Sequence, residues 1–220
     1  MSHFKKGFSQ FFKELSVNNH SAWFNENRKT YENEVKKPFG LFVDDMIIRI
    51  GKFEALHIKA SEAIFRINKD IRFSKDKTPY KTYMSANISS FGKKNKEWPG
   101  FYFQMNHEKI MLAGGAYLLE KENLYNVRQG IVKKAGEFKK ILDGKNFKNK
   151  FGTLQGDKNK VLPPEFKAVL EKQPWVANKQ FYYLRELPSE LVTDSKLPDI
   201  LMEYYLAAKP VNDFLKSLMK

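Results

Sequence analysis

The 220-residue chain has no cysteine, which excludes disulfide bonds, thiolate nucleophiles and metal or iron–sulfur sites held by thiolates. It also has no apolar run that approaches the ~18 residues of a membrane-spanning helix. Its first residues are basic but contain no apolar stretch of the kind that a signal peptide needs. Together these absences predict a soluble, cytoplasmic protein.

The common catalytic motifs are missing as well. There is no Walker-type phosphate loop, no G-x-G-x-x-G and no G-x-S-x-G. The four histidines are scattered, with no H-x-H or H-E-x-x-H pair, and we interpret each as a turn or surface residue (His3, His20, His57 and His107). The sequence therefore predicts no cofactor and no metal site.

Arginine is scarce in a chain that is otherwise rich in positive charge. The formal net charge is +14, yet only six of the 39 basic residues are arginine. Lysines spread over the whole chain mostly form a solvated face, whereas arginine can hold a carboxylate or phosphate through two parallel hydrogen bonds. The arginine positions are therefore the informative ones, and Arg66 and Arg72 fall within one short segment.

The hydrophobic pattern predicts one α+β domain over residues 1–220. The first sixty residues show helical spacing, as in Phe8, Phe11, Phe12 and Leu15. Apolar and polar residues alternate in the middle of the chain, which is typical of strands with one covered face. The expected strands are 64–68, 82–89, 100–106, 109–117 and, late in the chain, 181–187. We expect an antiparallel β-meander over residues 64–117, covered by N-terminal helices and by a mostly helical region over residues 118–220.

Segment 66–81 is the densest in charge and turn chemistry, with six basic and two acidic residues. Pro79 fixes its own φ and keeps Thr78 out of the helical region, so the backbone there is restrained. Clustered cations on a restrained backbone suit an anion site. The alternative is a loop held together by its own ion pairs, with Asp70 and Asp76 as the acidic partners.

If this segment is a site, Arg66, Arg72 and Lys77 would hold the anion and Tyr80 would orient it. Asp70 would position an arginine or act as a catalytic base. The candidate ligand-binding residues of the segment are Arg66, Arg72, Lys75, Lys77, Tyr80 and Lys81.

Further candidates lie outside this segment. Gly114 and Gly115 interrupt an apolar strand, which indicates a bulge or a close approach of backbone, and the space above them would hold either a packed helix or a ligand. A helical face carrying Trp23, Asn27 and Arg28 would form either a pocket rim or a core stripe with polar tips. Arg128, on the helix that follows the glycine pair, completes the set.

The sequence resembles a widespread bacterial and fungal family, domain of unknown function 2461. The resemblance is carried by Arg66-x-x-Lys69-Asp70-x-Arg72-Phe73-Ser74-Lys75-Asp76-Lys77-Thr78-Pro79-Tyr80-Lys81. It extends over nearly the whole chain, through Phe11-Phe12 to Asn18-Asn19, Trp23-Phe24 to Tyr31, Gly100 to Gln104, Gly114-Gly115, Arg128 and Phe181 to Pro188. Ala116 stands where a third glycine is common. The resemblance implies one soluble domain and carries over no catalytic residue or cofactor.

Three functions follow from these features. The first is an anion-recognising domain, which would be an enzyme or a binding module for a phosphorylated or carboxylated small molecule. The second is a nucleic-acid-binding protein that uses a diffuse lysine-rich surface, and the third is a structural or partner-binding protein without a ligand. A pocket at Arg66 and Arg72 favours the first, a basic stripe with exposed aromatic residues the second, and a fully ion-paired segment the third. None of them predicts a membrane partner, and the oligomeric state stays open.

Overall fold

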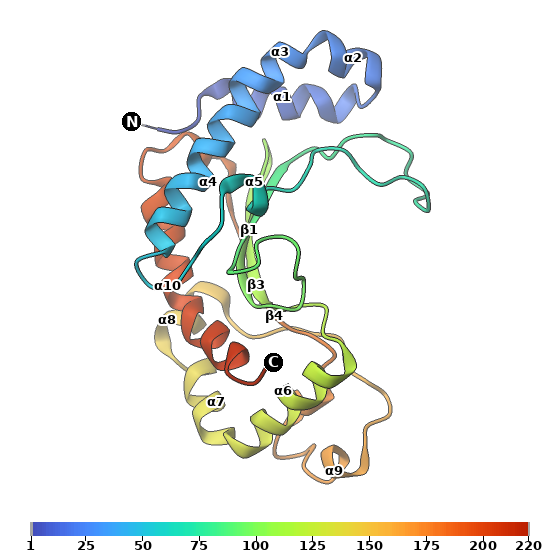
Figure 1. Ribbon diagram of the computed structural model, residues 1–220, viewed down its shortest axis with the longest axis vertical. Helices are drawn as coiled ribbons and strands as arrows, with labels where there is room; N and C mark the ends of the chain where they lie inside the picture. Colours follow the sequence, from blue (N-terminus) through green and yellow to red (C-terminus); the bar gives the residue numbers. More distant parts are fainter. Residues whose placement is uncertain (1, 220) are drawn as a thin grey trace. The chain divides into compact units, whose positions relative to one another are not determined.

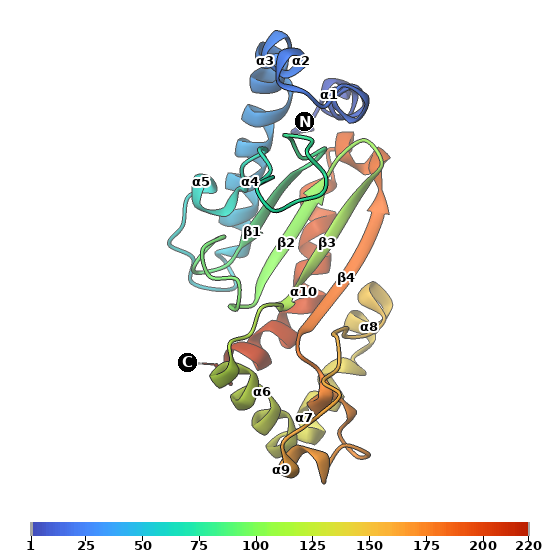
Figure 2. The same ribbon diagram turned by 90° about the vertical axis from the view of Figure 1, so that its right-hand side faces the viewer.

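Four strands form one open antiparallel sheet in the order β1-β2-β3-β4 in the computed structural model, which describes residues 2–219 (Figure 1). Figure 2 shows the strands side by side in this order. They are β1 (Met84–Ile88), β2 (Gly100–Met105), β3 (Lys109–Ala116) and β4 (Phe181–Pro188).

Helices come before and after these strands in the chain. Before the sheet lie α1 (Lys6–Val17), α2 (Ser21–Glu26), α3 (Arg28–Thr30), the π-helical turn η1 (Tyr31–Lys36), α4 (Lys37–Ile50) and α5 (Ala60–Ala63). Between β3 and β4 lie α6 (Lys121–Lys133), α7 (Ala135–Leu142), α8 (Lys145–Phe151), α9 (Pro164–Lys167) and the 3-10 turn η2 (Pro174–Ala177). The 3-10 turn η3 (Ser189–Thr193) and α10 (Leu197–Lys216) end the chain. The predicted α+β class is confirmed.

Alternation in the sequence places the apolar side chains of the strands correctly. In β1 and β2 the residues expected on the covered face are all buried: Met84, Ala86, Ile88, Phe101, Phe103 and Met105. Phe39 and Phe42 of α4 contact the Phe103 ring at centroid distances of 6.0 and 5.6 Å. This helix therefore covers the face of β2 that carries Phe103.

The strand expected at 64–68 is wrong. Only two isolated antiparallel bridges form there, between Ile64 and Ala86 and between Asn68 and Tyr80. The two bridges are in different registers: from Ile64 to Asn68 the segment advances by four residues, whereas its partner moves back by six, from Ala86 to Tyr80. No continuous ladder can therefore join them. Asn19 binds the two Tyr80 backbone groups that the bridge to Asn68 does not use, accepting from the N–H at 3.1 Å and donating to the carbonyl at 2.9 Å.

The chain divides into two compact units, and the expectation of a single domain stays a prediction. Unit 1 comprises residues 1–93, 102–112 and 186–202, and unit 2 comprises residues 94–101, 113–185 and 203–220. Buried phenylalanines dominate the core of unit 1, where Phe8, Phe12 and Phe42 are fully buried. In unit 2 the Phe138 and Phe214 rings stack at 4.9 Å, and Phe151 lies 4.5 Å from Tyr183.

Within residues 2–219, no helix has the length and apolar character that crossing a bilayer requires.

Candidate functional site

A large cleft opens in unit 1, with a volume of about 850 Å³. Its walls come from α2, α3, η1, α4 and α5, together with residues 64–68, Tyr80, Met84 and Lys93. Pro38 starts α4 in the first helical turn, where its missing N–H costs no hydrogen bond. The His20 side chain caps α2 by accepting from the Trp23 backbone N–H at 3.3 Å. These local signals fix the helices that form one wall of the cleft.

Three stacked or packed aromatic rings, those of Phe24, Tyr31 and Tyr80, line part of the cleft. Phe24 and Tyr80 stack with centroids 4.0 Å apart and planes at 15°, and Tyr31 packs against Phe24 at 5.1 Å. The Tyr31 hydroxyl lies 3.9 Å from Met84 Sδ, and burial, the larger cause, raises its pKa to about 12 together with nearby Glu32. The Tyr31 phenol is therefore neutral at neutral pH, and its ring packs against Phe24 beside the cleft.

Five basic and two acidic residues line the cleft: Arg28, Lys36, Lys37, Arg66 and Lys93, with Glu32 and Asp44. Three of the five cations have protein partners. Lys36 pairs with Glu32 at 2.8 Å, and Arg28 Nη2 donates to Asn25 Oδ1 at 2.7 Å. Lys93 Nζ donates to the Ser61 and Ile64 carbonyls at 2.6 Å each.

Arg66 differs from these three. Across residues 2–219, no hydrogen bond or ion pair engages its guanidinium, which is exposed at the cleft. Lys81 lies close to it, and the Lys81 ammonium donates to the Arg66 carbonyl at 2.9 Å. Burial lowers the pKa of Lys81, and the charge of Arg66 lowers it further. The two cations therefore repel each other, and an anion placed between them would relieve that repulsion.

The arm, residues 69–79, carries the rest of the predicted anion motif and lies outside the cleft lining. Arg72 grips Asp70 through two hydrogen bonds, Nε to Oδ1 at 2.9 Å and Nη2 to Oδ2 at 2.7 Å. Lys77 Nζ donates to the Ile71 carbonyl at 3.0 Å. The Arg72 guanidinium thus already holds a carboxylate in the way that it would hold a ligand.

A second ion pair braces the base of the arm. Lys69 Nζ contacts Asp76 at 2.7 Å and Thr78 Oγ1 at 2.6 Å, while Asp76 Oδ1 accepts from the Thr78 backbone N–H at 2.9 Å. Hydrogen bonds hold the pKa of Asp76 well below its usual range, those from Lys69 first and those from Thr78 next. Arg72 likewise lowers the pKa of Asp70. A carboxyl stabilised as the anion accepts a proton poorly, which weighs against Asp70 as a base.

The cleft and the arm lie within one family match. A protein-family model described as conserved hypothetical protein (DUF2461) matches residues 8–214. The chain belongs to this family. No curated protein matched the chain. The matched range includes every residue of the cleft and of the arm, so both are parts of the family domain.

The glycine pair of this DUF2461 chain meets backbone, as the sequence indicated. A Cβ added at Gly114 would overlap the Tyr183 hydroxyl and the Gly100 carbonyl, and one added at Gly115 would overlap the Phe181 carbonyl. Gly115 also has φ +94°, a conformation that side chains disfavour. The space beside Gly114 is therefore filled by protein.

The remaining candidates fall in different places. Trp23 packs against Phe11 at 5.5 Å, and Asn27 donates to the Trp23 carbonyl at 3.0 Å, so both support α2, whereas Arg28 reaches the cleft. Arg128 is 4% exposed inside unit 2, where its Nη2 donates to the Asn178 carbonyl at 2.9 Å. Burial lowers the pKa of Arg128, and its Nε is unsatisfied among the described residues.

The structure thus brings Arg28, Arg66 and Tyr80 to one cleft. It keeps Arg72, Lys75, Lys77 and Lys81 out of the lining, and it puts Gly114, Gly115 and Arg128 in contacts within unit 2. Sequence reasoning missed Lys36, Lys37 and Lys93. The spacing of Arg28, Glu32 and Lys36 at four-residue intervals was the available signal for a charged helical stripe.

None of the described residues forms a group of three or more histidine and carboxylate side chains that could hold a metal ion.

Proposed function

We propose that unit 1 recognises an anionic small molecule, bearing a phosphate or carboxylate group, in the cleft. The observation that carries this proposal is the unengaged guanidinium of Arg66 in a cleft lined by five cations and two carboxylates. Arginine is the side chain best suited to a bidentate grip on an oxyanion. Arg66 therefore takes the anion-binding role, with Lys37 adding charge across the cleft.

The body of the ligand would meet apolar surface. Leu41 lines the cleft although it is 68% exposed, and Ile64 and Phe65 beside it are half-buried. Covering such side chains yields about 25 cal/mol per Å² of apolar area removed from water. An anion with an apolar or planar body therefore fits the cleft better than a small inorganic ion does.

Arg72 is the matched control for Arg66. Both are exposed arginines of the same motif, but Arg72 is occupied by Asp70 and lies on the arm. The sequence assigned the anion to both, whereas the geometry supports Arg66. The ion-paired arm has the features expected of a structural loop. In this proposal only Arg66, at the start of the motif, binds the anion, and residues 69–79 have a structural role.

The test is thermal denaturation with pyrophosphate and with citrate, against sodium chloride at equal ionic strength. A ligand at 100 times its Kd stabilises the native state by about 2.7 kcal/mol, which raises Tm by roughly 5–11 °C in a chain of this size. We expect Arg66→Met to abolish this shift and Arg72→Met to keep it, with the Tm of both ligand-free variants near that of the parent. The reverse pattern would move the site to the arm, and no shift in the parent would end the proposal.

A further inference from the structure

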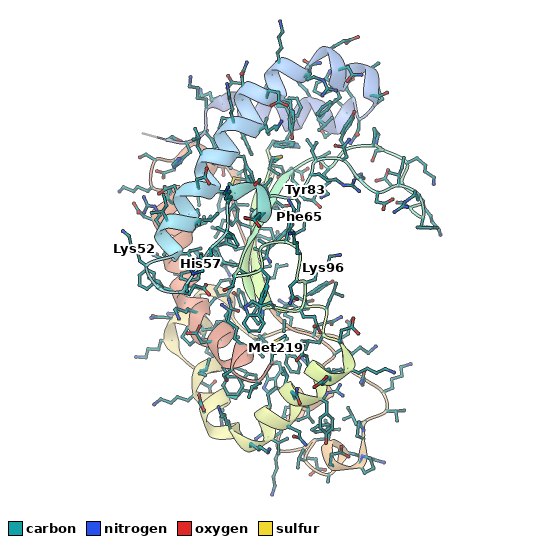
Figure 3. All side chains as sticks on the ribbon, in the orientation of Figure 1. Lys52, His57, Phe65, Tyr83, Lys96 and Met219 are labelled. Atoms are coloured by element: carbon teal, nitrogen blue, oxygen red, sulfur yellow. The ribbon has the colours of Figure 1, made fainter. Side chains whose placement is uncertain are left out.

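An aromatic cluster lies on the face of the sheet that α4 does not cover. It consists of Phe65, Tyr83 and Tyr102, all half-buried and all in unit 1, and we call it the tyrosine face. The Phe65 and Tyr102 rings meet at 6.0 Å, and Tyr83 is close enough to Tyr102 to influence its ionisation. Figure 3 labels Phe65 and Tyr83 on the side of β1 away from α4. Three half-buried rings thus lie on one face of the sheet.

Polar side chains that could hydrogen-bond a planar heterocycle lie beside these rings. The Tyr102 hydroxyl donates to Gln104 Oε1 at 2.8 Å and also bonds with Ser85. Burial, the largest cause, raises the pKa of Tyr102 to about 12, with a contribution from Tyr83 and an opposing one from Ser85. Tyr102 therefore stays a neutral phenol at neutral pH and does not repel a phosphate nearby.

The tyrosine face adjoins the cations of the cleft through Phe65. Phe65 lines the cleft beside Arg66, and the Lys81 ammonium lies 5.5 Å from the centroid of its ring. Lys81 has no carboxylate partner among the described residues, within which its ammonium donates only to the Arg66 carbonyl. Two uncompensated cations and three rings therefore meet within one small region of unit 1.

We propose that the anion is the phosphate of a nucleotide, held by Arg66 and Lys81 while its base stacks on the tyrosine face. This inference rests on the proposed function and names the class of its ligand. Bases stack on aromatic side chains, and arginine and lysine supply the matching charge for phosphate. A ligand without an aromatic ring would contact the two cations but could not stack on the tyrosine face.

A mononucleotide fits better than a long strand. The distances that define the cluster, 6.0 Å between Phe65 and Tyr102 and 5.5 Å between Lys81 and Phe65, are on the scale of one nucleotide. On the arm, Arg72 and Lys69 are paired with Asp70 and Asp76, so these two cations are already engaged and would not follow a phosphate backbone.

The experiment compares AMP, ribose 5-phosphate and pyrophosphate by isothermal titration calorimetry with the full chain. Stacking of one base contributes about 1–3 kcal/mol, so we expect AMP to bind about 5- to 150-fold tighter than ribose 5-phosphate. Tyr83→Leu should remove that advantage and leave ribose 5-phosphate unchanged, whereas Tyr83→Phe should keep it. Tyr125→Leu, at a 40% exposed tyrosine of unit 2, is the matched control and should bind AMP as the parent does. If Tyr83→Leu does not fold, as judged by circular dichroism, Phe65→Leu tests the same face.

The outcomes separate this inference from the function on which it rests. If pyrophosphate and ribose 5-phosphate bind through Arg66 but AMP binds no tighter, the nucleotide assignment falls and the anion site stands. If none of the three binds, both fall. An eight-residue oligoadenylate that binds much more tightly than AMP at equal nucleotide concentration would also overturn the assignment, because the protein would then read a strand.

Discussion

Replacing Gly114 by alanine should destabilise the protein strongly although it adds one methyl group. Gly114 lies on β3, where its Cα faces the Tyr183 hydroxyl and the Gly100 carbonyl within unit 2. The carbonyl is backbone and cannot move cheaply. Tyr183 is held by Phe151 at 4.5 Å and Phe147 at 5.8 Å, so its ring cannot turn away without disturbing both.

The expected magnitude follows from two contributions. Overpacking a closed site costs about 1–3 kcal/mol. Displacing Tyr183 also breaks its buried hydrogen bond to Asn212 Oδ1, which is 3.3 Å long, and such a bond contributes about 1 kcal/mol. The free energy of unfolding should therefore fall by about 2–4 kcal/mol, and Tm by roughly 5–15 °C.

Gly40→Ala is the matched control and should have the opposite sign. Gly40 lies inside α4, and an added Cβ there meets no heavy atom of the described residues within 4 Å. Alanine in a helix interior is favoured over glycine by about 0.5–1 kcal/mol, so Tm should rise slightly. Urea denaturation of parent, Gly114→Ala and Gly40→Ala gives the three free energies directly. A Gly114→Ala protein as stable as the parent would show that the backbone at this point is not closely approached, and the reasoning would be wrong.

Two further predictions concern unit 1. Phe103→Ala should lower the free energy of unfolding by about 3–5 kcal/mol, because Phe103 is fully buried against Phe39 and Phe42; a loss under ~1 kcal/mol in urea denaturation would contradict that packing. Asp76 should titrate below the ordinary carboxyl range in an NMR pH titration, because its folded pKa is depressed, and Lys69→Met should raise that pKa. With a depressed folded pKa, the stabilisation by Asp76 is present above its unfolded pKa and is lost as the pH falls through the folded value; an ordinary pKa in the parent would show that the brace does not form in solution.

The strands were predictable because alternating apolar and polar residues show directly which side chains point to the covered face of the sheet. Residues 100–105 follow that rule, and the structure buries Phe101, Phe103 and Met105. The segment 64–68 shows the limit, because its two bridges, to Ala86 and to Tyr80, are in different registers. Periodicity within the segment does not reveal the register of its partners.

The candidate site was predictable only in part, for a related reason. The motif contains Arg66 and Tyr80, which both line the cleft, and also Arg72, which does not. Whether an arginine is unengaged or paired depends on where Asp70 lies, two residues away, and turn geometry decides that. Lys93 joins the cleft through contacts with Ser61 and Ile64, which sequence spacing does not encode.

The two ends of the arm are tied to each other as well as to Asn19. The Lys69 N–H donates to the Pro79 carbonyl at 2.9 Å, and the Lys81 N–H donates to the Ile67 carbonyl at 2.8 Å. The arm therefore begins and ends at nearly one point of unit 1, as at the base of a hairpin. Such a base makes the protrusion modular: residues 70–78 can be shortened, lengthened or exchanged for a tight turn while Arg66 and Tyr80 keep their positions. The arm is thus a place beside the cleft where the sequence can change without altering the residues that line the cleft.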